Sequence, residues 1–133
     1  MVDTETLARI PLFASLTEPE LQQIAPWFEA RDVSEGVELV GEGASGYMFF
    51  ILVDGGCAVS LGSETVAQIA PGDYFGESAI VGAGRRNATI ATTSPSKVLV
   101  MFGTEFRRLQ QAQPGIASAI DDTARERLAA DGL

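Results

Sequence analysis

The chain has 133 residues, 46% of them hydrophobic, and a formal net charge of −9 with no histidine and one cysteine. This length fits a single domain with a hydrophobic core. The lack of histidine removes Ser-His-Asp and Cys-His catalytic arrangements and the usual zinc ligand sets, and the acidic balance opposes binding to nucleic acid. We expect the lone Cys57 to be a small buried residue in a strand.

The N-terminus has no basic stretch followed by an apolar one, so no secretory signal is visible. The longest apolar run, Tyr47 to Val53, is seven residues long. A bilayer-spanning helix needs ~20 residues. We therefore expect a cytoplasmic protein without membrane insertion.

The first thirty residues show helical signals. Thr17 and Glu20 have the spacing of a capping box, and Pro19 suits an early helical position. One apolar face at helical spacing follows, formed by Leu21, Ile24, Ala25 and Phe28. Pro26 is expected to weaken or end this helix. A shorter helical piece is expected around Leu7 to Ile10.

From about Arg31 to Phe102 the pattern indicates strands. Glycine and acidic residues separate short apolar runs, which are Val37–Val40, Tyr47–Val53, Ala58–Leu61, Val66–Ile69, Ala88–Thr92 and Lys97–Phe102. Asp54-Gly55-Gly56 predicts a hairpin, and Gly62-Ser63 predicts another turn. Short strands at roughly ten-residue spacing favour a sandwich or a barrel.

After Phe102 the helical period returns. Thr104 is expected to cap a helix that carries Phe106 and Leu109. Pro114-Gly115 separates this helix from a last one, whose apolar stripe is Ile116, Ile120, Ala124 and Leu128. The last helix is expected to lie on the strands or on a second subunit. No helix-turn-helix motif follows, so DNA binding is not expected.

One segment, Pro71 to Ile90 (PGDYFGESAIVGAGRRNATI), carries recognisable chemistry. A buried cyclic phosphodiester needs a paired charge and hydrogen-bond donors, which backbone N–H groups at the start of a short helix supply. Gly76 permits a close backbone approach, and Ser78 and Ala79 are small. Glu77 can accept a hydrogen bond from a ribose 2′-hydroxyl, and an arginine offers a planar fork to two phosphate oxygens.

This segment resembles the phosphate-binding cassette of the cyclic nucleotide-binding domain family. The matching residues are Phe75-Gly76-Glu77-Ser78-Ala79-Ile80-Val81, the loop Gly82-Ala83-Gly84-Arg85, and then Arg86-Asn87-Ala88-Thr89-Ile90. The nine-residue step from Glu77 to Arg86 is the usual step of that family. The similarity extends from about Leu7 to Arg127.

The resemblance implies a fold and a site. The fold would be mainly β with flanking helices, a double-stranded β-helix of the jelly-roll-like β-roll type. It would form one domain over 1–133, with helices in 1–30, the β-roll in 31–102 and C-terminal helices in 103–131. Glu77 would accept the ribose hydroxyl, Arg86 would pair with the phosphate, and Ile90 would line the base pocket. The other implied ligand-binding residues are Phe75, Gly76, Ser78, Ala79, Asn87 and Ala88.

Two residues depart from the family pattern. Arg85 stands where many relatives have proline. Asn87 is neither the hydroxyl residue frequent in cyclic GMP binders nor the alanine of many cyclic AMP binders, and its amide can touch phosphate or guanine or face solvent. We expect cyclic AMP to be favoured, with cyclic GMP as the alternative.

The sequence leaves three classes of function to compare. The favoured one is a non-enzymatic sensor that binds a cyclic nucleotide, needs no cofactor or metal, and signals through its C-terminal helices. Its further partners would be a second copy bound through the terminal helices or an effector outside this chain. The alternative is a structural or interaction module without ligand. An enzyme is disfavoured because no nucleophile with an oriented base and no metal cluster is visible.

Overall fold

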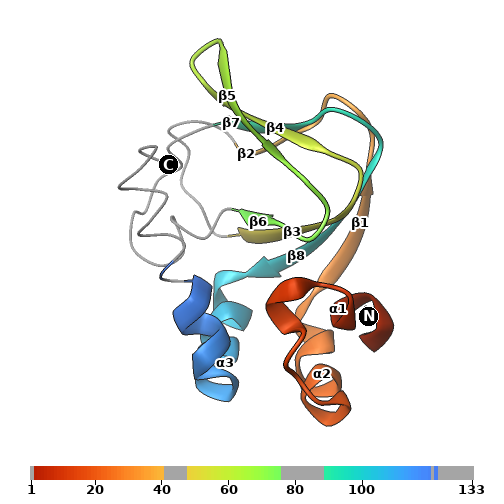
Figure 1. Cartoon of the computed structure of the whole chain (residues 1–133), viewed down its shortest axis with the longest axis vertical. Helices are drawn as coiled ribbons and strands as arrows, with labels where there is room; N and C mark the ends of the chain where they lie inside the picture. The colour runs from red at the N-terminus through yellow and green to blue at the C-terminus, as the bar shows by residue number, and fades with distance from the viewer. Residues whose placement is uncertain (1, 41–47, 76–88, 121, 123–133) are drawn as a thin grey trace.

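A computed structural model describes residues 2–40, 48–75, 89–120 and 122 (Figure 1). In these ranges short helices come first, strands follow, and longer helical structure comes after the last strand. The elements are α1 (Thr4–Ala8), η1 (Pro11–Phe13), α2 (Glu18–Ile24), η2 (Ala25–Trp27), β1 (Glu29–Val33), β2 (Glu38–Val40), β3 (Met48–Asp54), β4 (Cys57–Leu61), β5 (Glu64–Ile69), β6 (Tyr74–Phe75), β7 (Thr89–Thr92), β8 (Ser96–Phe102) and α3 (Gly103–Ala112). Residues 114–120 are also helical.

The described strands form two antiparallel four-stranded sheets that lie face to face (Figure 1). The first sheet has the strand order β1-β8-β3-β6, and the second has the order β2-β7-β4-β5. Along the chain every described strand lies in the other sheet from the strand before it, except that β4 and β5 share the second sheet. The expected mainly β fold with flanking helices is confirmed.

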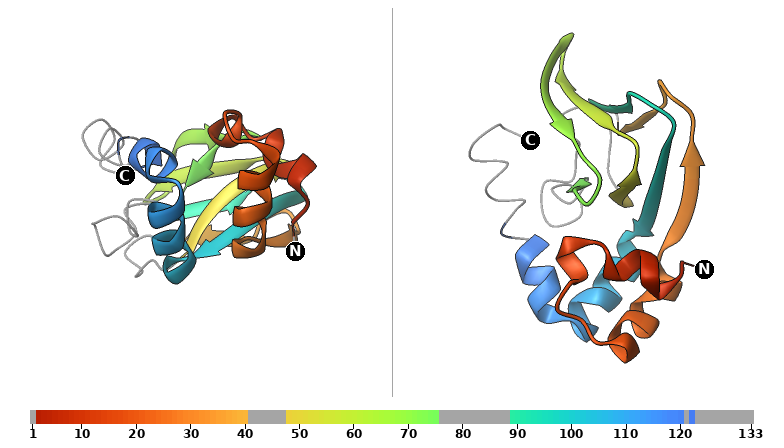
Figure 2. Two further views of the ribbon diagram at one scale, coloured as in Figure 1. Left: turned by 90° about the horizontal axis from the view of Figure 1, so that it is seen from below. Right: turned by 45° about the vertical axis from the view of Figure 1, so that its right-hand side comes forward.

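Two hydrophobic clusters lie on opposite faces of the first sheet. The helical cluster comprises Val2, Leu7, Ile10, Phe13, Leu21, Ile24, Ala25, Phe28, Phe49, Ile51, Leu99, Met101, Phe106, Leu109, Ile116 and Ile120. The inter-sheet cluster comprises Val40, Phe50, Leu52, Cys57, Val59, Ile69, Phe75, Ile90, Val98 and Val100. Figure 2 shows α1, α2 and α3 gathered on one side of the first sheet.

Side chains of β3 and β8 alternate between these two clusters. Phe49 and Ile51 belong to the helical cluster, whereas Phe50 and Leu52 belong to the inter-sheet cluster. Successive side chains of a strand point to opposite faces, so a strand covered on both faces reads as an unbroken apolar run. This explains the seven apolar residues predicted as one strand.

The N-terminal helices follow their local signals. The predicted capping box of α2 is present: Thr17 N donates to Glu20 Oε1 at 2.8 Å, and Glu20 N donates to Thr17 Oγ1 at 3.4 Å. Pro26 lies in the 3₁₀ turn η2 that follows α2, as its effect on a helix predicts. The short helix expected around Leu7 to Ile10 is present, but it begins earlier, at Thr4–Ala8, where Asp3 caps it.

The Asp54-Gly55-Gly56 turn corrects one prediction. It joins β3 to β4, but these strands lie in different sheets, so the turn is a crossing and not a hairpin. Gly55 has a φ of +96°, and Gly56 O accepts a hydrogen bond from Thr93 N at 2.9 Å. Adjacent glycines permit both a hairpin turn within one sheet and a crossing to the other sheet, so residue composition does not distinguish the two. The predicted Gly62-Ser63 turn does join a hairpin, β4 to β5.

Two strands and one helix cap differ from what the sequence predicts. Glu29–Val33 forms β1 and Tyr74–Phe75 forms β6, and neither strand was expected as a separate element. Phe102, not Thr104, occupies the N-cap position of α3, and the Thr104 hydroxyl donates to Glu105 Oε2 at 2.7 Å. The expected Thr104 cap was therefore wrong. Ala124 and Leu128 of the last predicted helix lie outside the described residues.

Candidate functional site

The candidate site begins where β6 ends and finishes where β7 begins. Phe75 closes β6 in the first sheet, and Thr89 opens β7 in the second sheet. The chain therefore passes from one sheet to the other between these two residues. Most predicted ligand-binding residues lie outside the described residues, and their roles stay predictions: Gly76, Glu77, Ser78, Ala79, Arg86, Asn87 and Ala88.

Phe75 forms one described flank of the site. It pairs with Phe50 across β6 and β3, and the two rings are stacked with centroids 5.0 Å apart and an interplanar angle of 11°. Only 1% of Phe75 is exposed, because the ring lies in the inter-sheet cluster. Here its role is to hold the start of the segment against β3. Its contact with a ligand stays a prediction.

Ile90 forms the other flank, on the inner face of the second sheet. It pairs with Val40 of β2 and with Val59 of β4, so these three apolar side chains make a row across the sheet. All three belong to the inter-sheet cluster, and 7% of Ile90 is exposed. The row is therefore part of the apolar inner face of the second sheet. The contact of Ile90 with a base stays a prediction.

A tight turn fixes the approach to the segment. Gly72 N donates to Leu52 O at 2.8 Å, Leu52 N donates to Asp73 O at 2.9 Å, and Ala70 N donates to Asp73 Oδ2 at 3.0 Å. Gly72 has a φ of +96°, and a Cβ placed there would lie 3.2 Å from Pro11 Cδ. The lead-in to the site is therefore held by β3 and stands close to the N-terminal helices.

A second anchor, Thr92, was not singled out from the sequence. Its hydroxyl donates to Ser34 O at 2.6 Å and accepts from Val37 N at 2.9 Å, and only 3% of the residue is exposed. These bonds fasten the end of β7 to the connection between β1 and β2. A threonine in a strand pattern carries no signal for partners more than fifty residues away, so reading the sequence misses it.

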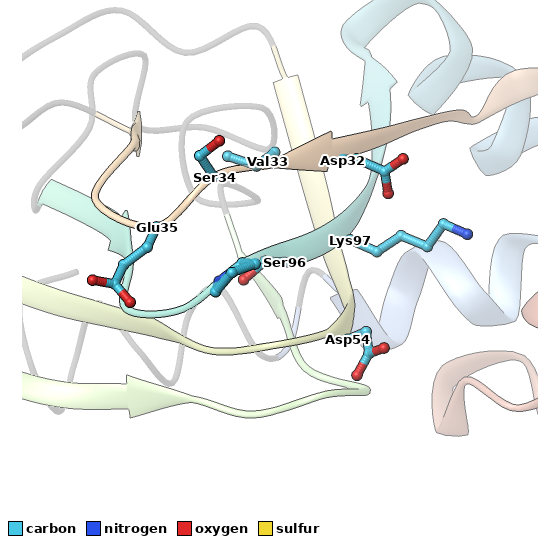
Figure 3. Close-up of a pocket in the computed structure, with 8 residues that line it drawn as sticks. Asp32, Val33, Ser34, Glu35, Asp54, Ser96 and Lys97 are labelled. Atoms are coloured by element: carbon cyan, nitrogen blue, oxygen red, sulfur yellow. The ribbon is translucent and has the colours of Figure 1, made fainter.

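A surface recess of about 510 Å³ lies at the ends of β1, β3 and β8 (Figure 3). It is lined in part by the carboxylates of Asp32, Glu35 and Asp54 together with Lys97. Neither Phe75 nor Ile90 lines this recess. The acidic lining disfavours an anionic phosphodiester, so we do not assign the ligand to it.

No helix in the described ranges is long and apolar enough to cross a bilayer. No group of three or more His, Cys, Asp or Glu side chains there is arranged to hold a metal ion. Cys57 is buried in β4, as expected, and burial raises the pKa of its thiol.

Comparison with known proteins gives a consistent picture. The family model described as "Cyclic nucleotide-binding domain" matches residues 30–113. A cyclic nucleotide-gated potassium channel of Mesorhizobium japonicum is 30% identical over 123 residues, which are 92% of this chain and 34% of the channel. A cAMP-dependent protein kinase regulatory subunit of Mycosarcoma maydis is 34% identical over 119 residues, which are 83% of this chain and 23% of the subunit.

A solved structure shares the fold. The regulatory domain of Toxoplasma gondii PKA, crystallised with cAMP, superposes with a TM-score of 0.80 at 21% identity, covering 92% of this chain and 48% of that one. Identity at this level supports the fold alone. The chain spans about a third or less of the length of the curated relatives it matches, so what those whole proteins do is not carried over with the fold.

Proposed function

Because this chain belongs to the cyclic nucleotide-binding domain family, we propose that it binds a 3′,5′-cyclic nucleotide, with cyclic AMP favoured, and acts as a sensor. The observation that carries the proposal is the match of the family model over a range that includes the whole segment from Phe75 to Ile90. The two ends of that segment lie in facing sheets, so the segment connects one sheet to the other. The family is a regulatory one, and in our proposal the chain carries out no catalysis.

Within the segment we propose a role for each polar residue. Arg86 pairs with the cyclic phosphate, because a guanidinium presents two parallel donors to two phosphate oxygens. Glu77 accepts the hydrogen bond of the ribose 2′-hydroxyl. Gly76, Ala79 and Asn87 offer backbone N–H groups, which partner an anion without adding a competing charge. Ser78 and Ala79 are small enough to keep the first turn open for this approach.

The base is the part of the ligand that the described residues help to place. The row formed by Val40, Ile90 and Val59 is apolar and lies where the segment ends. Burying a purine face on it is favourable, but an apolar wall does not discriminate adenine from guanine. In our proposal discrimination therefore depends on the segment itself, with cyclic AMP favoured and cyclic GMP as the alternative.

Signalling would use the helices that follow β8. Phe106 and Leu109 of α3 and Ile116 and Ile120 beyond it are buried in the helical cluster, together with residues of α1 and α2. That cluster covers the first sheet, which also supplies Phe75. A ligand changes such an arrangement only if it binds one arrangement more tightly than another. We propose a cytoplasmic effector, or a second copy contacted through the terminal helices, as the recipient.

Calorimetry with cyclic AMP and cyclic GMP on the wild type, Arg86→Ala and Arg85→Ala tests the proposal. The wild type should bind cyclic AMP more tightly than cyclic GMP. Arg86→Ala should lose at least ~3 kcal/mol, which is about 150-fold in Kd, because it leaves the phosphate buried without its partner. Arg85→Ala removes a neighbouring charge of the same kind and should change Kd by less than about tenfold, as a rim charge does.

Three results would contradict parts of the proposal. Absence of binding by the wild type at millimolar nucleotide would favour a structural or interaction module. Equal affinity of the wild type and Arg86→Ala would refute the role of Arg86. Appearance of the linear monophosphate during incubation would show an enzyme.

A further inference from the structure

A second recess, of about 460 Å³, lies between the N-terminal helices and the end of β3. Its walls come from the region of α1 and η1, from the last residues of β3, from the turn before β6 and from Lys97 of β8. A cavity of this size is typical of small-molecule sites in proteins. We propose that this recess binds a small organic carboxylate, a molecule with one negative charge and an apolar body. The proposal does not depend on the binding of a cyclic nucleotide.

Two cations from distant parts of the chain line the recess. Arg9 belongs to the helical side and Lys97 to the sheet side, and both side chains are exposed. In the part of the chain that the structure describes, the ion pair present joins Arg31 to Glu29, and neither Arg9 nor Lys97 takes part in one. Both cations are therefore available to an anion that enters the recess.

The carboxylates nearest to Lys97 in the sheet do not neutralise it. Asp32 of β1 and Asp54 of β3 are its neighbours across the strands. Figure 3 shows the Lys97 side chain extending past both carboxylates. Asp54 Oδ1 accepts a hydrogen bond from Gly55 N at 3.2 Å, so this carboxylate is engaged at the crossing between the sheets. Asp54 is the acid among the lining residues, so the lining carries two positive charges and one negative charge.

A carboxylate at the rim already experiences both cations. Hydrogen bonds from the Thr6 backbone and side chain lower the pKa of the Asp3 carboxyl, and the positive charges of Arg9 and Lys97 lower it further. Thr6 lines the recess, and its N donates to Asp3 Oδ1 at 2.7 Å. Asp3 is occupied in capping α1, but its response shows that the two cations act on the same region. A carboxylate that enters the recess would be stabilised in the same way.

The remaining walls favour an apolar body over a bare ion. They include the apolar residues Ile10, Pro11, Val53 and Pro71. A Cβ placed on Gly72 would lie 3.2 Å from Pro11 Cδ, so the turn and η1 nearly touch at this point. An inorganic ion would leave the apolar surface uncovered, whereas an organic molecule removes it from water. A planar carboxylate also suits the two parallel donors of a guanidinium.

Titration with benzoate, followed through the NMR signals of the Thr6 and Gly72 amides, tests the proposal. Benzamide has the same shape without the charge, and inorganic phosphate has charge without the apolar body. We expect the wild type to bind benzoate with a Kd of about 1 mM, a modest affinity that suits so small a ligand. Benzamide and phosphate should each bind at least about tenfold more weakly, because each lacks one of the two contributions.

Three variants show whether the cations are responsible. Arg9→Gln and Lys97→Gln should each weaken benzoate binding by about tenfold, the usual effect of losing a charge-assisted hydrogen bond. Arg107 is an exposed arginine of α3 outside the recess, so Arg107→Gln removes the same charge and should leave Kd unchanged. Melting temperatures verify that each variant folds. If Lys97→Gln does not fold, the comparison of Arg9→Gln with Arg107→Gln decides.

Several results would overturn the proposal. They are unchanged Thr6 and Gly72 signals with benzoate, equal binding of benzamide or phosphate, a wild-type Kd in Arg9→Gln, and an equal loss in Arg107→Gln. None of these measurements contains a cyclic nucleotide, so each of them leaves the function proposed above intact. Failure of the wild type to bind a cyclic nucleotide would, conversely, leave this recess and its ligand unaffected.

Discussion

Replacing Gly55 by alanine should lower the free energy of unfolding by about 2–5 kcal/mol. A Cβ at this position would overlap Ser96 Oγ and would lie 2.7 Å from Pro95 O and 2.8 Å from Ser96 Cα. The last two are backbone atoms and have no rotamer by which to move away, so the crossing between the sheets must shift. Overpacking of this kind costs about 1–3 kcal/mol, and a φ of +96° adds about 1–2 kcal/mol.

Urea denaturation of the wild type, Gly55→Ala and Gly36→Ala measures this loss. Gly36 also has positive φ, +82°, but a Cβ there would meet no atom within 4 Å. Gly36→Ala should therefore lose only the contribution of the strained backbone to the free energy of unfolding, about 1–2 kcal/mol. The slope of the free energy of unfolding against urea concentration should be the same in all three proteins. Equal losses in the two variants would show that the contact with Pro95 and Ser96 does not constrain the crossing, and the reasoning would be wrong.

Three further predictions concern the core, the thiol and the α2 cap. In urea denaturation, Phe106→Ala should lower the free energy of unfolding by about 3–5 kcal/mol, because Phe106 is only 1% exposed. Phe102 is 40% exposed, so Phe102→Ala should lower it by less than about 1 kcal/mol. Similar losses in the two variants would contradict the assigned burial. Cys57 should react with a disulfide reagent only after unfolding, because it is buried and its pKa is raised; fast reaction of the native protein would argue against this. Glu20→Gln should lower the melting temperature at neutral pH, and the difference in melting temperature between wild type and variant should disappear as the pH falls below 4.5. The pKa of Glu20 is lowered in the folded state, so its stabilising effect is present above its ordinary value and is lost on protonation; an equal gap at pH 3 and pH 7 would exclude the charge as the cause.

The sequence predicts the main elements of the fold because their signals are local. Thr17 and Glu20 define the start of α2 within four residues, and the apolar run of β3 needs no knowledge of its neighbours. β1 was missed as a separate strand because charged residues occupy this edge strand, and edge strands are commonly protected by charge. The crossing at Gly55 was misread because only tertiary pairing shows which sheet receives the next strand.

The candidate site likewise has features that local sequence predicts and others that depend on tertiary packing. Residue types and their spacing selected the segment from Phe75 to Ile90, and the structure shows that its two ends lie in facing sheets. The stacking of Phe75 on Phe50 depends on strand register, which the sequence does not encode locally. The contact between Gln113 and Glu20 depends on how two distant helices pack, so no reading of either region alone would reveal it.

The double coverage of β3 has a consequence for biosynthesis. Its apolar side chains are shielded on one face by helices and on the other by the second sheet, and its main hydrogen-bonding neighbour is β8, more than forty residues later. A nascent chain must therefore carry this uncharged apolar stretch in contact with water until residue 102 has left the ribosome. Segments of this kind associate readily between unfinished chains, so translation speed and chaperone supply should govern the yield of soluble protein.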